Sequence, residues 1–281
     1  MRETAVRRLR KALVCVLAGC LFALGACAEP AGQASAPPSA SSEATESGAS
    51  QSATASSAVE DVTPPEEEPL PDAASLPAET VLSPEDVERY GIAALFTVQP
   101  IPDAVFARME GVTFPADCPV ARDELRYLRV LHVDAQGQVK VGEMVANAAI
   151  ADDLCTIFRE LYEAAYPIER MRLADDYGGD DEASMRDNNT SAFNCRPIEG
   201  TGEQSRHSYG MAVDINTLYN PYVLASEGIV LPETAGAYVD RTVSGPYTIC
   251  AGDLCCQLFA EHGFAWGGDW MEPKDYQHFE K

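Results

Sequence analysis

Apolar and polar residues alternate along two neighbouring segments in the middle of the chain, residues 125–133 and 138–145. Alternation with a period of two is typical of β-strands, because successive side chains of a strand point to opposite faces. The residues between the two segments, Asp134 to Gly137, are of the types that form tight turns. The pattern therefore predicts a β-hairpin.

The apolar spacing changes to a helical period directly after the hairpin. Over residues 146–166, apolar residues recur at intervals of three and four, and Pro167 ends the pattern. This predicts a core helix packed on a sheet. A second, shorter helix is predicted over residues 253–262, with Gly263 as its stop, and His262 is expected to interact with its last carbonyls.

The first 26 residues combine a basic start with an apolar stretch, Ala12 to Ala23, that is too short to cross a bilayer. The run Leu24 to Cys27 resembles a bacterial lipobox. We therefore expect residues 1–26 to be a lipoprotein signal peptide and Cys27 to be the lipidated first residue of the mature protein. An ordinary cleaved signal peptide or an uncleaved anchor is the alternative. The expected location is extracytoplasmic, at the bacterial cell membrane.

Residues 27–82 are predicted to be a disordered acidic tether. Between Ala28 and Glu88 there are thirteen acidic residues and no Lys or Arg, in a background of Ala, Ser, Pro and Thr. Such a segment buries too little apolar surface to offset the entropy lost on ordering. Ser83, followed by Pro84 and two acids, is a helix N-cap signal. The folded domain is therefore predicted over residues 83–281.

Charge and cysteine content narrow the function classes. The net charge is -24, and removal of the signal's five basic and one acidic residues takes it to -28, which argues against nucleic-acid binding. The domain is expected to be a monomer. Without a paired Cys-x-x-Cys unit a cysteine zinc site is not expected. Disulfides are expected in an exported protein, although the sequence leaves open the pairing among its six remaining cysteines: Cys118, Cys155, Cys195, Cys250, Cys255 and Cys256.

Two segments near the C-terminus carry the candidate chemistry. The first runs from Ser205 to Asp214, and its alternation from Met211 onward predicts a strand that His207 precedes in a loop. The second ends the chain and contains His278. Two imidazoles and one carboxylate form the three-ligand set of a catalytic zinc, which leaves a position open for water. We therefore predict His207, Asp214 and His278 as zinc ligands.

Asp275 is the spare acid of this set. It lies three residues before His278, a spacing that brings both side chains to one side of a helix or a tight turn but not of a strand. We predict that Asp275 is the catalytic base. His132 and His262 lie outside both segments and are not expected to bind metal.

The two segments together resemble a known family. Ser-x-His-x-x-Gly-x-Ala-x-Asp, followed by Asp-x-x-His-Phe-Glu, is similar to the M15 family of zinc D-Ala-D-Ala carboxypeptidases and related peptidoglycan peptidases. The run Trp266 to Trp270 resembles the branch that includes L-alanyl-D-glutamate endopeptidases. The resemblance covers residues 142–281. It implies an α+β fold, of the hedgehog and DD-peptidase type, in which a small antiparallel sheet with flanking helices carries the site.

The resemblance also implies roles for residues upstream. Arg196 matches an arginine of the family that would contact substrate and stabilise developing negative charge, and Ser205 would position the substrate. The alternative for Arg196 is a surface salt bridge. The acidic run 175–187 is interpreted as a solvated loop in preference to the rim of a cleft. One departure is Asp275, where many M15 carboxypeptidases have Glu.

The sequence thus predicts a zinc metallopeptidase that hydrolyses an amide bond in peptidoglycan stem peptides. D-Ala-D-Ala carboxypeptidase and L-Ala-D-Glu endopeptidase activities both remain open. A catalytically silent peptidoglycan-binding module on the same fold is the alternative from another class. Trp266 and Trp270 are either core aromatics or the floor of a substrate cleft.

Overall fold

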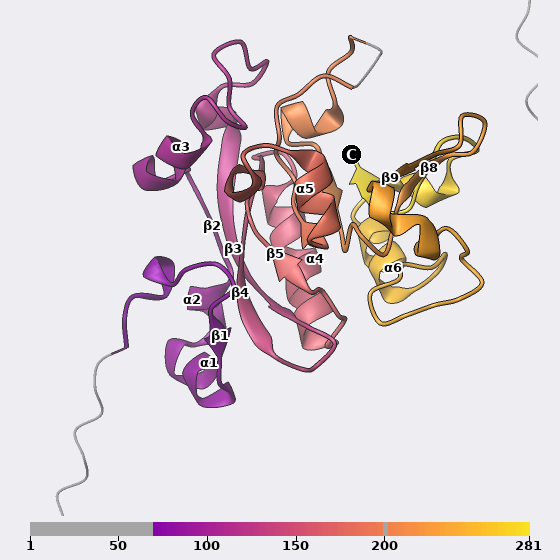
Figure 1. Ribbon diagram of the computed structural model, residues 1–281. Helices are drawn as coiled ribbons and strands as arrows, with labels where there is room; N and C mark the ends of the chain where they lie inside the picture. The colour runs from indigo at the N-terminus through magenta and orange to yellow at the C-terminus, as the bar shows by residue number, and fades with distance from the viewer. Residues whose placement is uncertain (1–69, 199–201) are drawn as a thin grey trace, which may run out of the picture. The chain divides into compact units, whose positions relative to one another are not determined.

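The predicted hairpin is the centre of the largest sheet. Strands β3 (Leu125–Val133) and β4 (Val139–Asn147) pair antiparallel over their whole length. β1 (Val81–Leu82) adds beside β4 and β2 (Thr97–Gln99) beside β3, which gives the order β1-β4-β3-β2. The computed structural model describes residues 70–198 and 202–281 (Figure 1).

Helix α4 (Ala151–Glu163) packs on this sheet as predicted, but it begins five residues later than the sequence indicated. Residues 146 and 147 still belong to β4. The Asn147 side chain then accepts a hydrogen bond from the Ala149 amide, at 3.0 Å, and this turn delays the helix. The buried face of α4 packs on the sheet residues Leu128, Val130 and Met144, and its own members are Ala151, Leu154, Ile157, Phe158 and Leu161.

The predicted N-cap is confirmed. The Ser83 side chain accepts from the Asp86 amide, and Asp86 accepts from the Ser83 amide, at the start of α1 (Pro84–Tyr90).

The domain boundary lies earlier than residue 83, however. Leu76 and Leu82 are already buried in a cluster with residues of β3 and β4. The sequence analysis missed Leu76 and Leu82 because the sequence around them is acidic.

The remaining elements connect the large sheet to the smaller sheets of the described residues, two of three strands and one of two, or form strands of those sheets. They are η1 (Ala73–Ser75), α2 (Ile92–Leu95), α3 (Asp103–Met109), η2 (Arg122–Glu124), β5 (Arg170–Met171), η3 (Ala174–Tyr177), α5 (Asp181–Arg186), β6 (Asn189–Thr190), η4 (Arg206–Tyr209), β8 (Tyr222–Leu224), β9 (Ile229–Leu231), η5 (Glu233–Tyr238), η6 (Gly267–Asp269) and β11 (Lys274–Asp275).

The second sheet is antiparallel and has the order β10-β12-β7, from β10 (Ala265–Trp266), β12 (His278–Glu280) and β7 (Ala212–Asp214). It packs on α6 (Leu254–Glu261), where the Phe259 and Phe279 rings stack at 4.2 Å. Both aromatics belong to the same buried cluster as the inner face of α4. The fold is therefore α+β, with helices beside small antiparallel sheets, as predicted.

Two histidines outside the candidate site have structural partners. His132 is buried on β3, and its Nδ1 lies 2.8 Å from the Ile168 carbonyl. His262 follows α6, but its Nδ1 bonds to Asp153 at 3.0 Å instead of to the last helical carbonyls.

Within residues 70–198 and 202–281, no helix is long and apolar enough to span a membrane. Residues 1–69, with the predicted signal peptide and Cys27, lie outside the described residues.

The buried face of α4 predicts a large effect of one substitution. Phe158→Ala should lower the free energy of unfolding by about 3–5 kcal/mol, because it leaves a cavity between α4 and α6, where Phe158 meets Phe259 edge to face. Val243→Ala is the control, since Val243 is 72% exposed and should change stability by no more than about 0.5 kcal/mol. Urea denaturation measures both. Equal stability of the two variants would contradict the assignment of this core.

Candidate metal centre

The three predicted ligands meet at the edge of the second sheet. His207 Nε2 lies 3.1 Å from Asp214 Oδ2, and His278 Nδ1 lies 3.0 Å from Asp214 Oδ1. The two imidazole nitrogens are 3.2 Å apart. One donor atom from each residue lies within 4.8 Å of the others. The structure therefore brings together all three residues that the sequence selected.

Strand register and a short turn position them. Asp214 and His278 are direct partners in the β7–β12 pairing. His207 lies on η4, where the Ser205 side chain accepts from the His207 amide at 3.2 Å and caps the turn. Ser205 thus has a positioning role, and its predicted contact with substrate stays a prediction. Gly210 ends the turn with φ +64, and a Cβ there would lie 2.7 Å from the Asn147 nitrogen.

Hydrogen bonds on the far side of each ring set its orientation. His207 Nδ1 lies 2.5 Å from the Ala192 carbonyl, which can only accept, so this nitrogen carries a proton and Nε2 is the ring nitrogen that faces Asp214. His278 Nε2 lies 3.2 Å from Glu280 Oε2, which directs Nδ1 toward the same point. Metal-binding histidines typically donate their second N–H to a carbonyl or a carboxylate in this way.

Glu280 is a site residue that the sequence analysis left without a role. Its signal was available, because residues two apart on a strand lie on the same face, and Glu280 follows His278 by two. The hydrogen bond from His278 holds the pKa of Glu280 below its usual range. Glu280 is therefore an ionised carboxylate that orients an imidazole.

The electrostatics of the cluster suit a cation. Burial alone would raise the pKa of Asp214, but the adjacent His207 and His278 outweigh it and hold that pKa well below its usual range. Burial alone would lower the pKa of His278, yet its hydrogen bonds to Asp214 and Glu280 raise it to about 10. Two imidazoles and an ionised carboxylate form a donor set that zinc accepts. The residues therefore fit a zinc ion.

Asp275 lies beside this cluster without belonging to it. It ends β11, and a bend at residues 276–277 separates it from His278 on β12, so neither a helix nor a hydrogen-bonded turn joins the two residues. Among the described residues, its Oδ1 is buried and has no hydrogen-bond partner. Burial also raises the pKa of Asp275 to about 6. An unpaired carboxylate oxygen beside three ligands is the feature expected of a group that exchanges protons with a bound water.

A glycine lets Asp275 approach, and its neighbour accommodates a tryptophan. A Cβ on Gly267 would lie 2.6 Å from the Asp275 carbonyl oxygen, and one on Gly268 would lie 2.3 Å from the Trp266 ring. Any side chain at either position would overlap these groups. Gly267 is therefore required by close packing against the candidate base, and Gly268 by close packing against Trp266.

Arg196 is held by an acid from the run that was interpreted as a solvated loop. Its Nε forms an ion pair with Asp181, and Asp181 also accepts from Asn194 Nδ2 at 2.7 Å. The loop interpretation was wrong in this respect: the run forms η3 and α5, and Asp181 opens α5 at the edge of the centre. Burial raises the pKa of Asp181, and the charges of Arg196 and His207 oppose that rise. No local pattern distinguished Asp181 from the surrounding acids.

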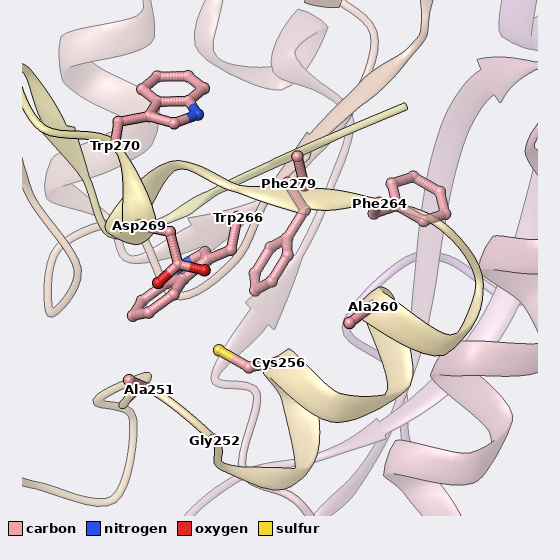
Figure 2. A pocket seen from close by; sticks show the side chains of 10 residues that line it. Ala251, Gly252, Cys256, Ala260, Phe264, Trp266, Asp269, Trp270 and Phe279 are labelled. Atoms are coloured by element: carbon pink, nitrogen blue, oxygen red, sulfur yellow. The ribbon is translucent and has the colours of Figure 1, made fainter. Parts of the chain in front are cut away.

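The two tryptophans divide between core and site. Trp266 is buried and donates from Nε1 to the Tyr276 carbonyl at 2.9 Å. Trp270 is half-buried, and its ring centre lies 5.4 Å from that of His278. Both line a pocket of about 260 Å³ over α6, into which the Cys256 thiol points (Figure 2). None of the clustered ligands lines this pocket, so Trp270 lies between it and the metal centre.

Comparison with known proteins adds one finding. Residues 199–281 match the family described as D-alanyl-D-alanine carboxypeptidase. The resemblance to M15 peptidases is confirmed over this range. The matched range holds all three clustered ligands and Asp275, whereas Arg196 lies just before it. No curated protein and no solved structure matches the chain.

The geometry predicts how substitutions in the cluster would affect zinc binding. His207→Ala should reduce bound zinc to near zero, because two protein ligands remain. Glu280→Gln should keep the ligands but weaken zinc affinity roughly 10- to 100-fold, as expected for the loss of an orienting carboxylate. His262→Ala is the control, since His262 bonds to Asp153 away from the centre. Elemental analysis and competition with a zinc indicator measure these changes. Full zinc in His207→Ala would exclude it as a ligand.

Proposed function

We propose that the protein is a zinc-dependent peptidase that hydrolyses an amide bond in peptidoglycan stem peptides. The observation that carries the proposal is the buried, unpartnered Oδ1 of Asp275 beside the cluster of His207, Asp214 and His278. Those three residues would hold the ion, which when bound would polarise the scissile carbonyl and acidify a water. The family match to residues 199–281 supports peptidase chemistry.

Asp275 performs the proton transfers in this proposal. Its carboxylate accepts a proton from the attacking water and later gives it to the leaving amine, so that the amine departs neutral. Packing of Asp275 against Gly267 and its strand pairing with Tyr222 hold the Asp275 backbone beside the cluster. Glu280 is already engaged with His278 and is therefore the weaker candidate for the base.

Arg196 supplies positive charge at the edge of the site. Asp181 pairs with its Nε, and the Arg196 backbone nitrogen donates to Ser208 Oγ at 2.9 Å. The guanidinium held there would stabilise the oxyanion of the tetrahedral intermediate or bind a substrate carboxylate. The ion pair with Asp181 is also the salt bridge given as the alternative for Arg196, and this side chain can form it while it contacts substrate.

The bond that is cut is most consistent with a terminal D-Ala-D-Ala linkage, since the matched family carries that description. Asp275 in place of Glu and the run Trp266 to Trp270 favour L-Ala-D-Glu cleavage as the second candidate. A catalytically silent binding module is the less favoured alternative, because such a module needs no unpaired acid beside its ligands.

A stem-peptide digest tests the activity. Purified peptide incubated with the zinc-loaded protein should release terminal D-Ala or a fragment that begins at D-Glu, and a chelator should stop the release. Mass spectrometry identifies the products. Asp275→Asn should keep zinc and lower turnover roughly 100- to 10,000-fold, whereas Asp269→Asn, an exposed acid of the same segment, should stay near wild type. Undiminished turnover in Asp275→Asn would overturn the assigned base.

We also propose that the protein is extracytoplasmic and anchored to the bacterial membrane through a lipid on Cys27. The net charge of the chain is -24, so electrostatic attraction would not hold it at an anionic membrane surface. Its partners would then be the stem peptides and the membrane, without nucleic acid, and the domain would act as a monomer.

Removal of the lipidation site tests the anchor. Cys27→Ala should move the protein from the membrane fraction to the soluble fraction, because the signal's apolar stretch is too short to span a bilayer. Cys20→Ala is the matched control, since it alters the same stretch and leaves Cys27 in place. Fractionation and immunoblotting report the distribution. If Cys27→Ala stayed with the membrane, another segment would be the anchor.

A further inference from the structure

Two half-buried cysteines from distant parts of the chain meet beside the metal centre. Cys118 lies in the loop after α3, and Cys195 lies in the segment that leads to Arg196. Both pack against the same buried cluster, which includes Phe193 and Met109. The Cys118 thiol is near enough to Cys195 to contribute to the raised pKa of the Cys195 thiol, and both thiols are free in this structure. The contact is tertiary and has no counterpart in a sequence motif.

The backbones that carry the two thiols are already held together. The Cys195 amide donates to the Thr113 carbonyl at 3.0 Å, and the Phe114 and Phe193 rings lie 5.9 Å apart. The Cys118 amide donates to Pro115 within its own turn. These contacts hold the two segments side by side, and such proximity of two cysteines is what a disulfide needs.

We propose that Cys118 and Cys195 form a disulfide bond in the exported protein. The inference uses the extracytoplasmic location proposed above, because disulfides persist in oxidising compartments. The oxidant is a disulfide of a thiol oxidoreductase. The two cysteine thiols lose two protons and two electrons and form one S–S bond, while the oxidoreductase disulfide gains them and becomes two thiols.

Burial and the nearby Cys118 raise the pKa of Cys195 to about 12 in the reduced fold. Only the thiolate reacts in exchange, so the folded, reduced protein should oxidise slowly. The bond is therefore expected to form while the segments are still accessible during folding. Once formed, the bond lies in a half-buried position that a reductant can still reach.

The bond would affect the segment that contains Cys195 and Arg196. The Arg196 amide donates to Ser208 Oγ, and that hydroxyl in turn donates to the Arg196 carbonyl at 2.8 Å. Ser208 follows the ligand His207 on η4. A Cys118–Cys195 bond would thus connect the loop after α3, through one residue, to the turn that holds the metal centre. We expect the bond to limit movement of the segment that contains Cys195 and Arg196.

Peptide mapping gives a direct test. The mature full-length chain is produced in an oxidising compartment, alkylated under denaturing conditions without reductant, and digested with trypsin. Cys118 and Cys195 fall in separate peptides, 109–122 and 187–206, because trypsin does not cut between Arg196 and Pro197. Mass spectrometry should find these two peptides joined, with the loss of two hydrogens. Complete alkylation of both cysteines, or a bond from either to another cysteine, overturns the proposal.

Thermal unfolding gives a second, independent measurement. The double variant Cys118→Ser/Cys195→Ser should melt roughly 5–15 °C lower than the oxidised wild type, as expected for the loss of one disulfide. Reductant should lower the wild-type melting temperature toward that of the double variant and leave the double variant unchanged. Cys155→Ser, a half-buried cysteine on α4, is the control and should retain the sensitivity to reductant. An oxidised wild type without that sensitivity contradicts the inference.

These measurements are independent of peptidase activity. A chain that carries the bond but cleaves no stem peptide would retain this inference and refute the proposed function. A chain that cleaves stem peptides with both thiols free would do the reverse.

Discussion

The pairing of β7 with β12 is the constraint on which the rest of the site depends. Asp214 and His278 are direct neighbours across this pair, and a slip of one residue would turn one of them toward the core. The intervening core residues prevent such a slip, since Val213 and Phe279 are fully buried on the opposite face. The arrangement of the donor atoms is thus enforced by hydrophobic packing, and the polar groups themselves contribute little to selecting it.

Burying two imidazoles and a carboxylate beside one another costs free energy, because each group loses hydration. The protein offsets part of that cost with the Ala192 carbonyl and with Glu280, which satisfy the outward nitrogens of His207 and His278. A bound cation would offset more, and its binding would then contribute to folding. The chemistry and the stability of this region are coupled for that reason.

Much of the fold and the centre of the site followed from local sequence. Alternation predicted the hairpin of the large sheet, and the Ser83 cap marked a helix start, because both signals depend on neighbouring residues. The start of α4 was misplaced, since a single side chain, Asn147, bends the chain there. The boundary of the domain was placed too late because Leu76 and Leu82 lie within an acidic segment.

The outer part of the site was less accessible to such reasoning. Asp181 reaches Arg196 only through the tertiary fold, and nothing distinguishes it among the acids near it in the sequence. The contact between Cys118 and Cys195 is likewise set by the packing of a loop on a distant segment. Glu280 follows His278 by two residues, but no strand was predicted there, so their shared face on β12 was not anticipated.

Strand β12 gives consecutive residues two different tasks. His278 and Glu280 lie on the face that carries the candidate metal centre, while Phe279, between them, stacks on Phe259 in the core. A shift or lengthening of these three residues that improved one task would alter the other. Changes of substrate preference are therefore expected outside β12, for example at the exposed Met271, where a new side chain leaves the core packing unchanged.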